Sequence, residues 1–154
     1  MNKDRPWVIL NVAMTADGKI DTSARQGAQI SSPTDWERVD RLRAESDAVM
    51  VGGKTLLRED PRLTVKSADL RAERLERGLG ENPAKVGIIS EAALEPDSRF
   101  LTIGPAQTKL FTTRRTSSDQ IGLLRDMGVQ VFVAGDQRVD LAFVMQSLQE
   151  QGVE

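Results

Sequence analysis

The chain has 154 residues, a size that suits one domain with its own hydrophobic core. Its net charge of −2 gives no electrostatic reason to expect nucleic acid or an anionic membrane as a partner. Cys and His are both absent, which excludes disulfides, thiolate metal sites and the Ser-His and Cys-His nucleophile systems. We therefore expect no metal centre. Any catalysis must use carboxylates, Lys, hydroxyls, backbone amides or a bound cofactor.

The first apolar run, residues 7 to 14 (WVILNVAM), is rich in β-branched residues and does not alternate with polar ones. It predicts a strand buried on both faces. The run is too short and too interrupted for a signal peptide, so the cytoplasm is the expected location. The following stretch, MTADGKI, contains a turn at Asp17-Gly18. Thr15, Asp17 and Lys19 are either ordinary polar residues of a surface turn or form one wall of a ligand-binding site.

Residues 33 to 45 are predicted to be a helix, because Ser32 is a natural N-cap and Pro33 suits the first helical position. The apolar stripe of this helix consists of Trp36, Val39 and Leu42. Arg43 lies only about 20° from Trp36 on the helical wheel. A guanidinium near a buried face snorkels, pairs with a carboxylate or binds a ligand, and the pattern alone favours the first two.

Strands and helices alternate along the rest of the chain. Strands are predicted at 47–53, 84–90, 108–113 and 128–134, and helices at about 54–60, 117–127 and 138–151, with one short helix within 67–83. This alternation predicts a single α/β domain, a three-layer α/β/α arrangement around a largely parallel sheet. The last helix ends at Gly152, where a further strand would come next, so we expect the last strands of the sheet to be missing.

Ligands of open α/β sheets gather at the carboxyl ends of strands. Here those ends carry the stretches 15–19, 52–55 and 112–115, which mix small, hydroxyl and basic residues. Each could be an ordinary polar loop, but the coincidence of three favours a polyanion or nucleotide site. The GGKT stretch is no P-loop, because Ala48 stands where the first glycine should be. The Arg114-Arg115 pair suits a nucleotide 2′-phosphate.

The turn EDPRLTVK, residues 59 to 66, is rich in hydrogen-bonding groups. Asp60-Pro61 predicts an extended backbone at residue 60, because proline disfavours other conformations of the residue before it. Arg62 and Lys66 flank the turn. They are either solvated surface cations or a pair that holds a phosphate.

Three stretches together, RPWVILNVAMTADGKI, RLRAESDAVMVGGKTLLREDPRLTVK and KLFTT, resemble the pyrimidine reductase of riboflavin biosynthesis. This RibD C-terminal family has a dihydrofolate-reductase-like fold, and the chain matches about the N-terminal two thirds of its domain. The resemblance implies NADPH-dependent reduction of the ribosyl group of a 2,5-diamino-6-ribosylamino-pyrimidinone 5′-phosphate to ribityl. It also implies a cytoplasmic homodimer.

The resemblance also assigns roles to residues. Asp17 becomes the candidate catalytic residue, which would orient the reacting sugar or a proton-carrying water. The resemblance implies substrate binding by Arg43, Leu63, Lys66 and Gly27, and the pattern of residues 59–66 adds Arg62. It implies cofactor binding by Ala13, Thr15, Gln29, Thr55 and Glu59. The strand ends add Gly53, Thr113 and Arg114 as candidates for the same role. Lys66 replaces the family's Arg and lacks its bidentate fork.

Two rival interpretations stay open at this point. A dihydrofolate or pteridine reductase shares the fold, but the phosphate-type segment DPRLTVK argues against it. A non-catalytic nucleotide-binding domain is favoured by the absence of the family's Glu-Gly-Gly strand and glycine loop, which bind cofactor phosphates.

Overall fold

The computed structural model describes residues 5–22 and 30–154. Its elements, in chain order, are α1 (Pro33–Glu45), β1 (Ala48–Gly52), α2 (Gly53–Glu59), α3 (Ala68–Glu76), β2 (Ala84–Ile88), α4 (Arg99–Thr102), β3 (Thr108–Thr112), α5 (Ser118–Asp126), β4 (Gln130–Val133) and α6 (Leu141–Glu150). No helix in these ranges is long and apolar enough to cross a membrane.

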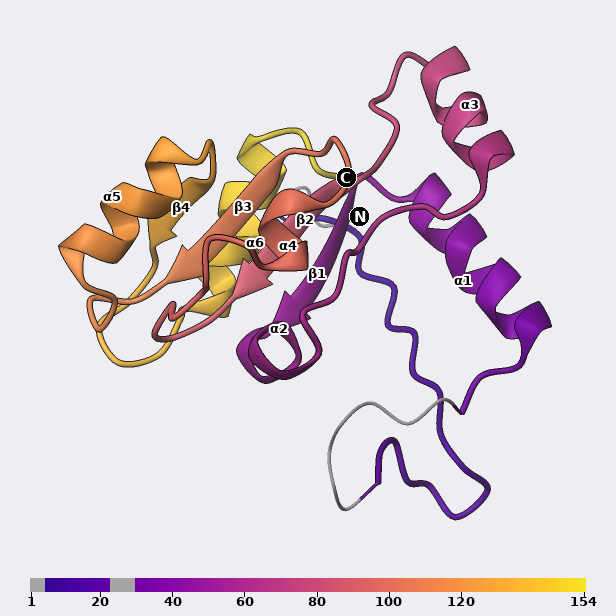
Figure 1. Ribbon diagram of the computed structural model, residues 1–154, viewed down its shortest axis with the longest axis horizontal. Helices are drawn as coiled ribbons and strands as arrows, with labels where there is room; N and C mark the ends of the chain where they lie inside the picture. Colours follow the sequence, from indigo (N-terminus) through magenta and orange to yellow (C-terminus); the bar gives the residue numbers. More distant parts are fainter. Residues whose placement is uncertain (1–4, 23–29) are drawn as a thin grey trace.

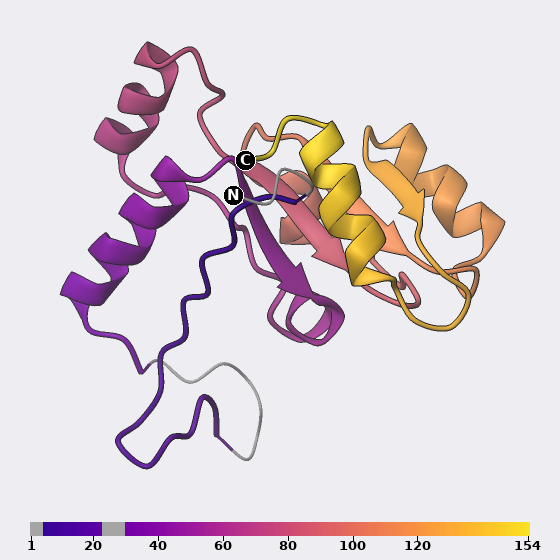
Figure 2. The same ribbon diagram turned by 180° about the vertical axis from the view of Figure 1, so that it is seen from behind.

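The four strands form one parallel sheet in the order β1-β2-β3-β4, which confirms the predicted α/β class. Helices α2, α4 and α5 pack against one face, and α6 packs against the other (Figure 1). Figure 2, the view from behind, shows α6 lying across the sheet. Helices α1 and α3 pack together beside β1, where Ala44, Val65 and Leu70 form a small separate core. The three predicted layers are therefore present.

Alternation along β3 explains why the sheet carries a helical layer on each face. Leu110 points into the core under α2, α4 and α5, and Phe111 points into the core under α6. Both side chains are fully buried. The Phe111 ring stacks on Phe132 of β4 with the ring centroids 4.8 Å apart. All five residues of β3 are buried, as expected for a central parallel strand that is covered on both faces.

Local signals place the starts of α1 and α5 as predicted, whereas α6 starts at Leu141, after its Asp140 cap, and not near residue 138. The Ser32 side chain accepts a hydrogen bond from the Asp35 amide (3.2 Å), and Pro33 occupies the first turn of α1. The Ser117 side chain accepts from the Gln120 amide at the start of α5 in the same way. Such caps satisfy amides that the helix itself leaves without a partner.

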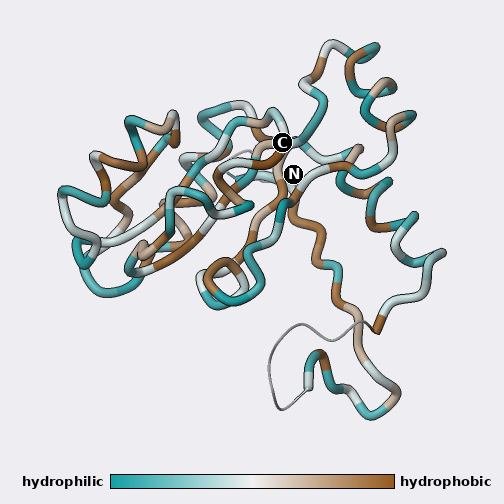
Figure 3. Tube along the Cα trace, in the orientation of Figure 1, coloured by the Kyte–Doolittle hydropathy of each residue, from teal (hydrophilic) through white to brown (hydrophobic). Residues whose placement is uncertain are grey.

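The predicted strand at 7–14 is wrong. This stretch has no strand pairing in the structure and runs as an extended segment beside α1 (Figure 1). Trp7, Leu10 and Met14 are 79%, 85% and 64% exposed. Figure 3 shows the segment as an apolar stretch of tube outside the sheet. Apolar residues define which segments can enter a sheet, but a strand forms only where a neighbouring edge supplies hydrogen-bond partners.

The structure also corrects the backbone at residue 60 and adds one helix. Asp60 has φ 42° and ψ 61°, which is left-handed rather than extended. Its carboxylate accepts hydrogen bonds from the amides of Arg99 (2.7 Å) and Phe100 (2.9 Å), and these bonds offset the unfavourable backbone. Both amides belong to α4, a four-residue helix that is too short to show a periodic pattern in the sequence.

Candidate functional site

The carboxyl ends of the parallel strands meet at one edge of the sheet. The Thr113 hydroxyl, directly after β3, donates to the Ser90 carbonyl after β2. A side chain at Gly53 would place its Cβ 2.9 Å from Ile89 Cγ1, so glycine is required there for α2 to approach β2. Gly52 has no atom within 4 Å of the corresponding position, so its backbone faces open space. The structure thus brings together Gly53 and Thr113 from two of the three predicted strand ends.

Both arginines after β3 are exposed and paired with carboxylates. Arg114 Nε lies 3.1 Å from Asp136 Oδ1, and Arg115 Nη2 lies 2.5 Å from Glu91 Oε2. The Arg114 side chain is 80% exposed. Exposed ion pairs of this kind are weak, with a median contribution of about 0–1 kcal/mol, so an anionic ligand can compete for either guanidinium.

Residues 15 to 19 form a turn whose polar groups bond to one another. Gly18, at φ 80°, donates its amide to the Thr15 carbonyl (2.9 Å), and the Thr15 amide donates to the Lys19 carbonyl (2.8 Å). The Asp17 carboxylate accepts from the Thr15 hydroxyl and pairs with the Lys19 ammonium. Within the described chain, the hydrogen bonds of Thr15, Asp17 and Lys19 are all internal to this turn. The turn lies away from α2 (Figures 1 and 2).

This geometry determines the protonation of Asp17. The Lys19 ammonium, and after it the Thr15 hydroxyl, lower the pKa of the Asp17 carboxyl below its usual value of 3.8. Asp17 is therefore an anion at neutral pH. It can orient a hydroxyl or a water by accepting a hydrogen bond, but it holds no proton to donate.

A second group of predicted residues gathers where α1 faces the loop of residues 60–67. Arg43 is half-buried, and its Nη1 donates to the Thr64 carbonyl (3.1 Å). Burial lowers the pKa of this guanidinium, and the nearby Asp40 carboxylate acts in the opposite direction. Lys66 Nζ lies 4.6 Å from the centroid of the Trp36 ring, a cation–π contact. Arg43 and Lys66 therefore both contact groups between α1 and the loop of residues 60–67.

The remaining predicted residues are distributed as follows. Leu63 is 3% exposed and belongs to the main core, so its backbone rather than its side chain is available to a ligand. Thr55 is half-buried and Glu59 is exposed, both on α2. Arg62 is exposed, and Ala13 lies half-buried in the extended segment. Gly27 and Gln29 fall outside the described residues.

Three polar residues outside the predicted set make hydrogen bonds that hold the backbone near the site. Asp40, 6% exposed, accepts two backbone amides from the loop of residues 60–67. Ser90 accepts from Thr113 at the strand ends, and Asp60 caps α4. Asp40 could have been found, because it lies one turn after Trp36 and only about 40° from it on the helical wheel of α1. Ser90 could have been found as the last residue of a predicted strand.

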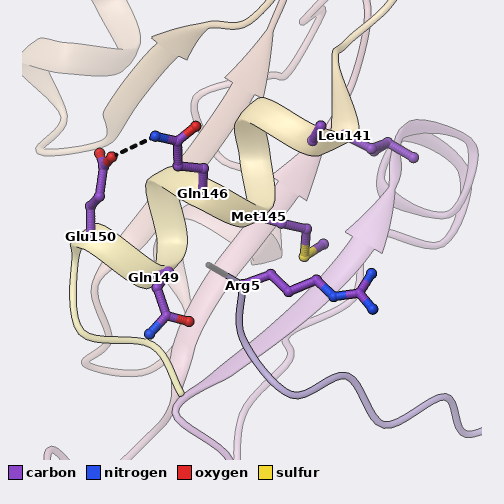
Figure 4. Close-up of a pocket in the computed structure, with 7 residues that line it drawn as sticks. Arg5, Leu141, Met145, Gln146, Gln149 and Glu150 are labelled. Carbon is purple, nitrogen blue, oxygen red and sulfur yellow. Dashed lines mark hydrogen bonds between the residues drawn. The ribbon is translucent and has the colours of Figure 1, made fainter. Parts of the chain in front are cut away.

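A hollow of about 730 Å³ lies elsewhere, between α6 and the start of the N-terminal segment (Figure 4). Its lining consists of Arg5, Leu141, Ala142, Met145, Gln146, Gln149 and Glu150, and contains none of the predicted site residues. The strand ends and the 60–67 loop carry the polar groups that a phosphorylated ligand requires, so we place the candidate site there. No group of three or more acidic residues in the described ranges could hold a metal ion.

A family model and two named relatives point to the same protein family. The family model described as RibD C-terminal domain matches residues 6–154. The chain is 40% identical over 149 residues to the 2,5-diamino-6-ribosylamino-4(3H)-pyrimidinone 5′-phosphate reductase of Archaeoglobus fulgidus, covering 97% of this chain and 67% of that protein. It is 41% identical over 150 residues to the protein of the same name from Methanothermobacter thermautotrophicus, covering 97% and 65%. The chain thus spans about two thirds of the length of these relatives.

The fold matches a solved structure as well. A diaminohydroxyphosphoribosylaminopyrimidine deaminase/5-amino-6-(5-phosphoribosylamino)uracil reductase from Thermotoga maritima superposes with a TM-score of 0.73. The superposition covers 98% of this chain and 38% of that one, at 23% sequence identity. At this identity the comparison establishes the fold alone.

Proposed function

Because this chain belongs to the RibD C-terminal domain family, we propose that it reduces the ribosyl group of 2,5-diamino-6-ribosylamino-4(3H)-pyrimidinone 5′-phosphate to the ribityl form in riboflavin biosynthesis. The observation that carries the proposal is the identity of 40% and 41%, over 97% of the chain, to two archaeal reductases of that name. The chemistry requires neither His nor Cys, and the chain has neither.

NADPH is the proposed cofactor, and when bound it supplies the hydride. The donor set at the strand ends fits a phosphorylated dinucleotide. Gly52 leaves its backbone open, and Arg114 is an exposed cation that can pair with a 2′-phosphate. The same edge holds Thr113, with Thr55 on the neighbouring helix. Arg114 is the basis for preferring NADPH to NADH.

The proposed substrate wall is formed by α1 and the 60–67 loop. Arg43, Arg62 and Lys66 are three cations in and beside that loop, and they suit a 5′-phosphate. Arg62 is exposed, with no hydrogen bond or ion pair to the rest of the described chain. From its place in the family motif we assign Asp17 the role of orienting the reacting sugar or a water. Its carboxylate is an anion that can accept a hydrogen bond, and its turn lies away from α2 in this structure (Figures 1 and 2).

The direct test mixes the purified protein with NADPH and the pyrimidinone phosphate and follows the absorbance of the reduced nicotinamide. Oxidation that depends on both compounds is expected. Dihydrofolate in place of the pyrimidinone phosphate distinguishes the pteridine reductases. Tight binding of NADPH without oxidation would contradict the proposal and favour a non-catalytic nucleotide-binding domain.

A matched pair of variants tests the substrate wall. Arg43→Ala removes the half-buried guanidinium that faces the loop, and KM for the pyrimidinone phosphate should rise at least about tenfold, the effect of one lost charge-assisted hydrogen bond. Arg41→Ala removes the same side chain from the exposed face of α1, where it pairs with Glu73, and should leave KM unchanged. Equal KM values for the two variants would refute the ligand role of Arg43.

We also propose that the protein acts in the cytoplasm as a homodimer and as a single reductase domain. The outer edge of β1 supports association, because among the described residues no strand pairs with it. Sedimentation at several protein concentrations measures the oligomeric state, and a monomer throughout the range would contradict this part.

A further inference from the structure

The loop of residues 60–67, between α2 and α3, combines an unusual backbone with many hydrogen bonds to neighbouring side chains. Asp60 and Leu63 have φ values of 42° and 54°, conformations that non-glycine residues rarely adopt. Such a backbone persists only where its surroundings hold it, and it is commonest at binding sites. The side chains that hold this loop are therefore informative.

Asp40 of α1 holds the end of the loop. Its two carboxylate oxygens accept the backbone amides of Lys66 and Ser67, each at 2.7 Å. The side chain is 6% exposed, so these bonds form away from water. A buried carboxylate with both oxygens bonded to main-chain amides is a strong anchor, because charge-assisted bonds exceed neutral ones in strength.

Three further side chains fix the peptides just before that point. Arg43 Nη1 donates to the Thr64 carbonyl, and Asn82 Oδ1 accepts the Val65 amide (2.9 Å). Arg71 Nη1 donates to the carbonyls of Val65 (3.0 Å) and Lys66 (2.7 Å). The contacts come from α1, α3 and the segment before β2, so the loop is held from several sides.

The loop of residues 60–67 presents two positively charged side chains. The Arg62 side chain is exposed, and Lys66 projects over the ring of Trp36. The Lys66 amide is the group that Asp40 accepts, so the position of this cation depends directly on Asp40.

We infer that Asp40 is a positioning residue for substrate binding: it sets the backbone of Lys66 and Ser67 so that the loop presents its cations to the substrate phosphate. The inference rests on the proposed function. Its physical basis is preorganisation, because a loop already ordered in the free protein loses little conformational freedom when the ligand binds. The competing view is that Asp40 only ties α1 to α3, whose shared core contains Ala44, Val65 and Leu70.

The test compares Asp40→Asn with Asp69→Asn. The first keeps the volume of the side chain but loses one acceptor, and the second makes the same change at an exposed position in the first turn of α3. Calorimetry measures Kd for the pyrimidinone phosphate, steady-state kinetics measure KM and kcat, and hydrogen exchange reports on the amides of residues 66 and 67.

For Asp40→Asn we expect Kd and KM to rise about tenfold, the effect of one lost charge-assisted bond, while kcat changes by less than about twofold. Exchange at residues 66 and 67 should accelerate, while exchange in β2 and β3 stays unchanged. Asp69→Asn should match the wild type in every measurement. If Asp40→Asn does not fold, Arg71→Met releases the same peptides from the α3 side and should raise Kd about threefold.

The outcomes separate the inference from the proposed function. Faster exchange at residues 66 and 67 with a wild-type Kd would show that Asp40 is structural only, and would overturn the inference alone. A wild-type protein that does not bind the pyrimidinone phosphate would overturn the proposed function and the inference with it. A rise in Kd with unchanged exchange would also contradict the inference, because the effect would not pass through the loop.

Discussion

Residues 7–14 and the stretch that forms β3 are both predicted to be strands, yet one lies outside the sheet and the other inside it. Leu10 is 85% exposed, whereas Leu110 is fully buried. β3 has a paired strand on each side and a helical layer over each face. Residues 7–14 have neither in the described structure, although they are more apolar than β3, which contains Lys109 and two threonines. Hydropathy makes a segment suitable for a sheet, and neighbouring strands determine whether it enters.

The same comparison explains two lysines that lie inside. Lys85 of β2 is fully buried, and Lys109 of β3 is 4% exposed. The backbone pairing of these strands places the side chains in the interior, where each finds hydrogen-bond acceptors. Lys85 Nζ donates to the carbonyls of Phe100 (2.5 Å) and Ile103 (3.1 Å), and Lys109 Nζ donates to Gln130 (3.1 Å). Lysines are thus buried in β2 and β3, while Trp7 and Leu10 of the N-terminal segment are exposed.

The largest effect should come from one substitution made in both regions. Leu110→Ala empties a fully buried position and should lower the free energy of unfolding by about 2–5 kcal/mol. Leu10→Ala removes the same atoms from an exposed position and should change it by less than about 0.5 kcal/mol. Urea denaturation of both variants measures the contrast. Similar losses would mean that residues 7–14 are packed in solution.

A second pair compares side chains that hold backbone. Asn82, 7% exposed, accepts the Val65 amide and donates to the Pro105 carbonyl (3.2 Å). Asn82→Ala leaves the Val65 amide without its partner and should cost about 1–3 kcal/mol of unfolding free energy. Asn11 in the exposed segment accepts from Arg38 Nη2 (2.6 Å), and Asn11→Ala should cost less than about 0.5 kcal/mol. Thermal melting is sufficient here, and a larger shift for Asn11→Ala would reverse the comparison.

The third prediction concerns the buried charge. Lys85→Met leaves the carbonyls of Phe100 and Ile103 without a donor but removes the cost of burying an ammonium, so the net loss at neutral pH should be only about 1 kcal/mol. Burial lowers the pKa of Lys85 below its ordinary value of 10.5.

The sign of the pH dependence follows from that lowered pKa. Between the folded pKa and 10.5 the unfolded chain binds the proton and the folded protein does not, so stability rises with pH in this window. The advantage of the wild type over Lys85→Met should therefore grow as pH approaches 10.5. Denaturation at a series of alkaline pH values measures this difference. A constant difference would show that the ammonium is hydrated in the folded state.

The smallest effect on stability is expected from charge added to the exposed segment. Ile9→Lys should change the free energy of unfolding by less than about 0.5 kcal/mol, because Ile9 is 60% exposed. It should nevertheless reduce self-association and the binding of apolar dyes, since exposed apolar stretches promote both. Light scattering and dye fluorescence of wild type and variant test this. Unchanged scattering would mean that residues 7–14 do not mediate association.

Much of the fold could be predicted because its signals are local. The cap at Ser32, the proline after it and the apolar spacing of α1 lie within one helix. Short stretches of β-branched and aromatic residues predict strands β1 to β4, and their parallel order follows from the intervening helices. The site was only partly predictable. Arg43 and Asp40 both stand out as charges near the apolar stripe of α1, but the partners of Asp40, the amides of residues 66 and 67, lie far along the chain, so its role required the structure.

By itself the sequence determined which stretches are helical, which are apolar enough for a sheet, and which turns carry charge. Capping, proline geometry and apolar periodicity act within a few residues and need no partner elsewhere. Only the tertiary structure decided that residues 7–14 stay outside the sheet, that Lys85 lies inside it, and that Asp40 holds the 60–67 loop. Strand pairing and the burial of a charge depend on groups far away in the chain, and folding alone brings those groups together.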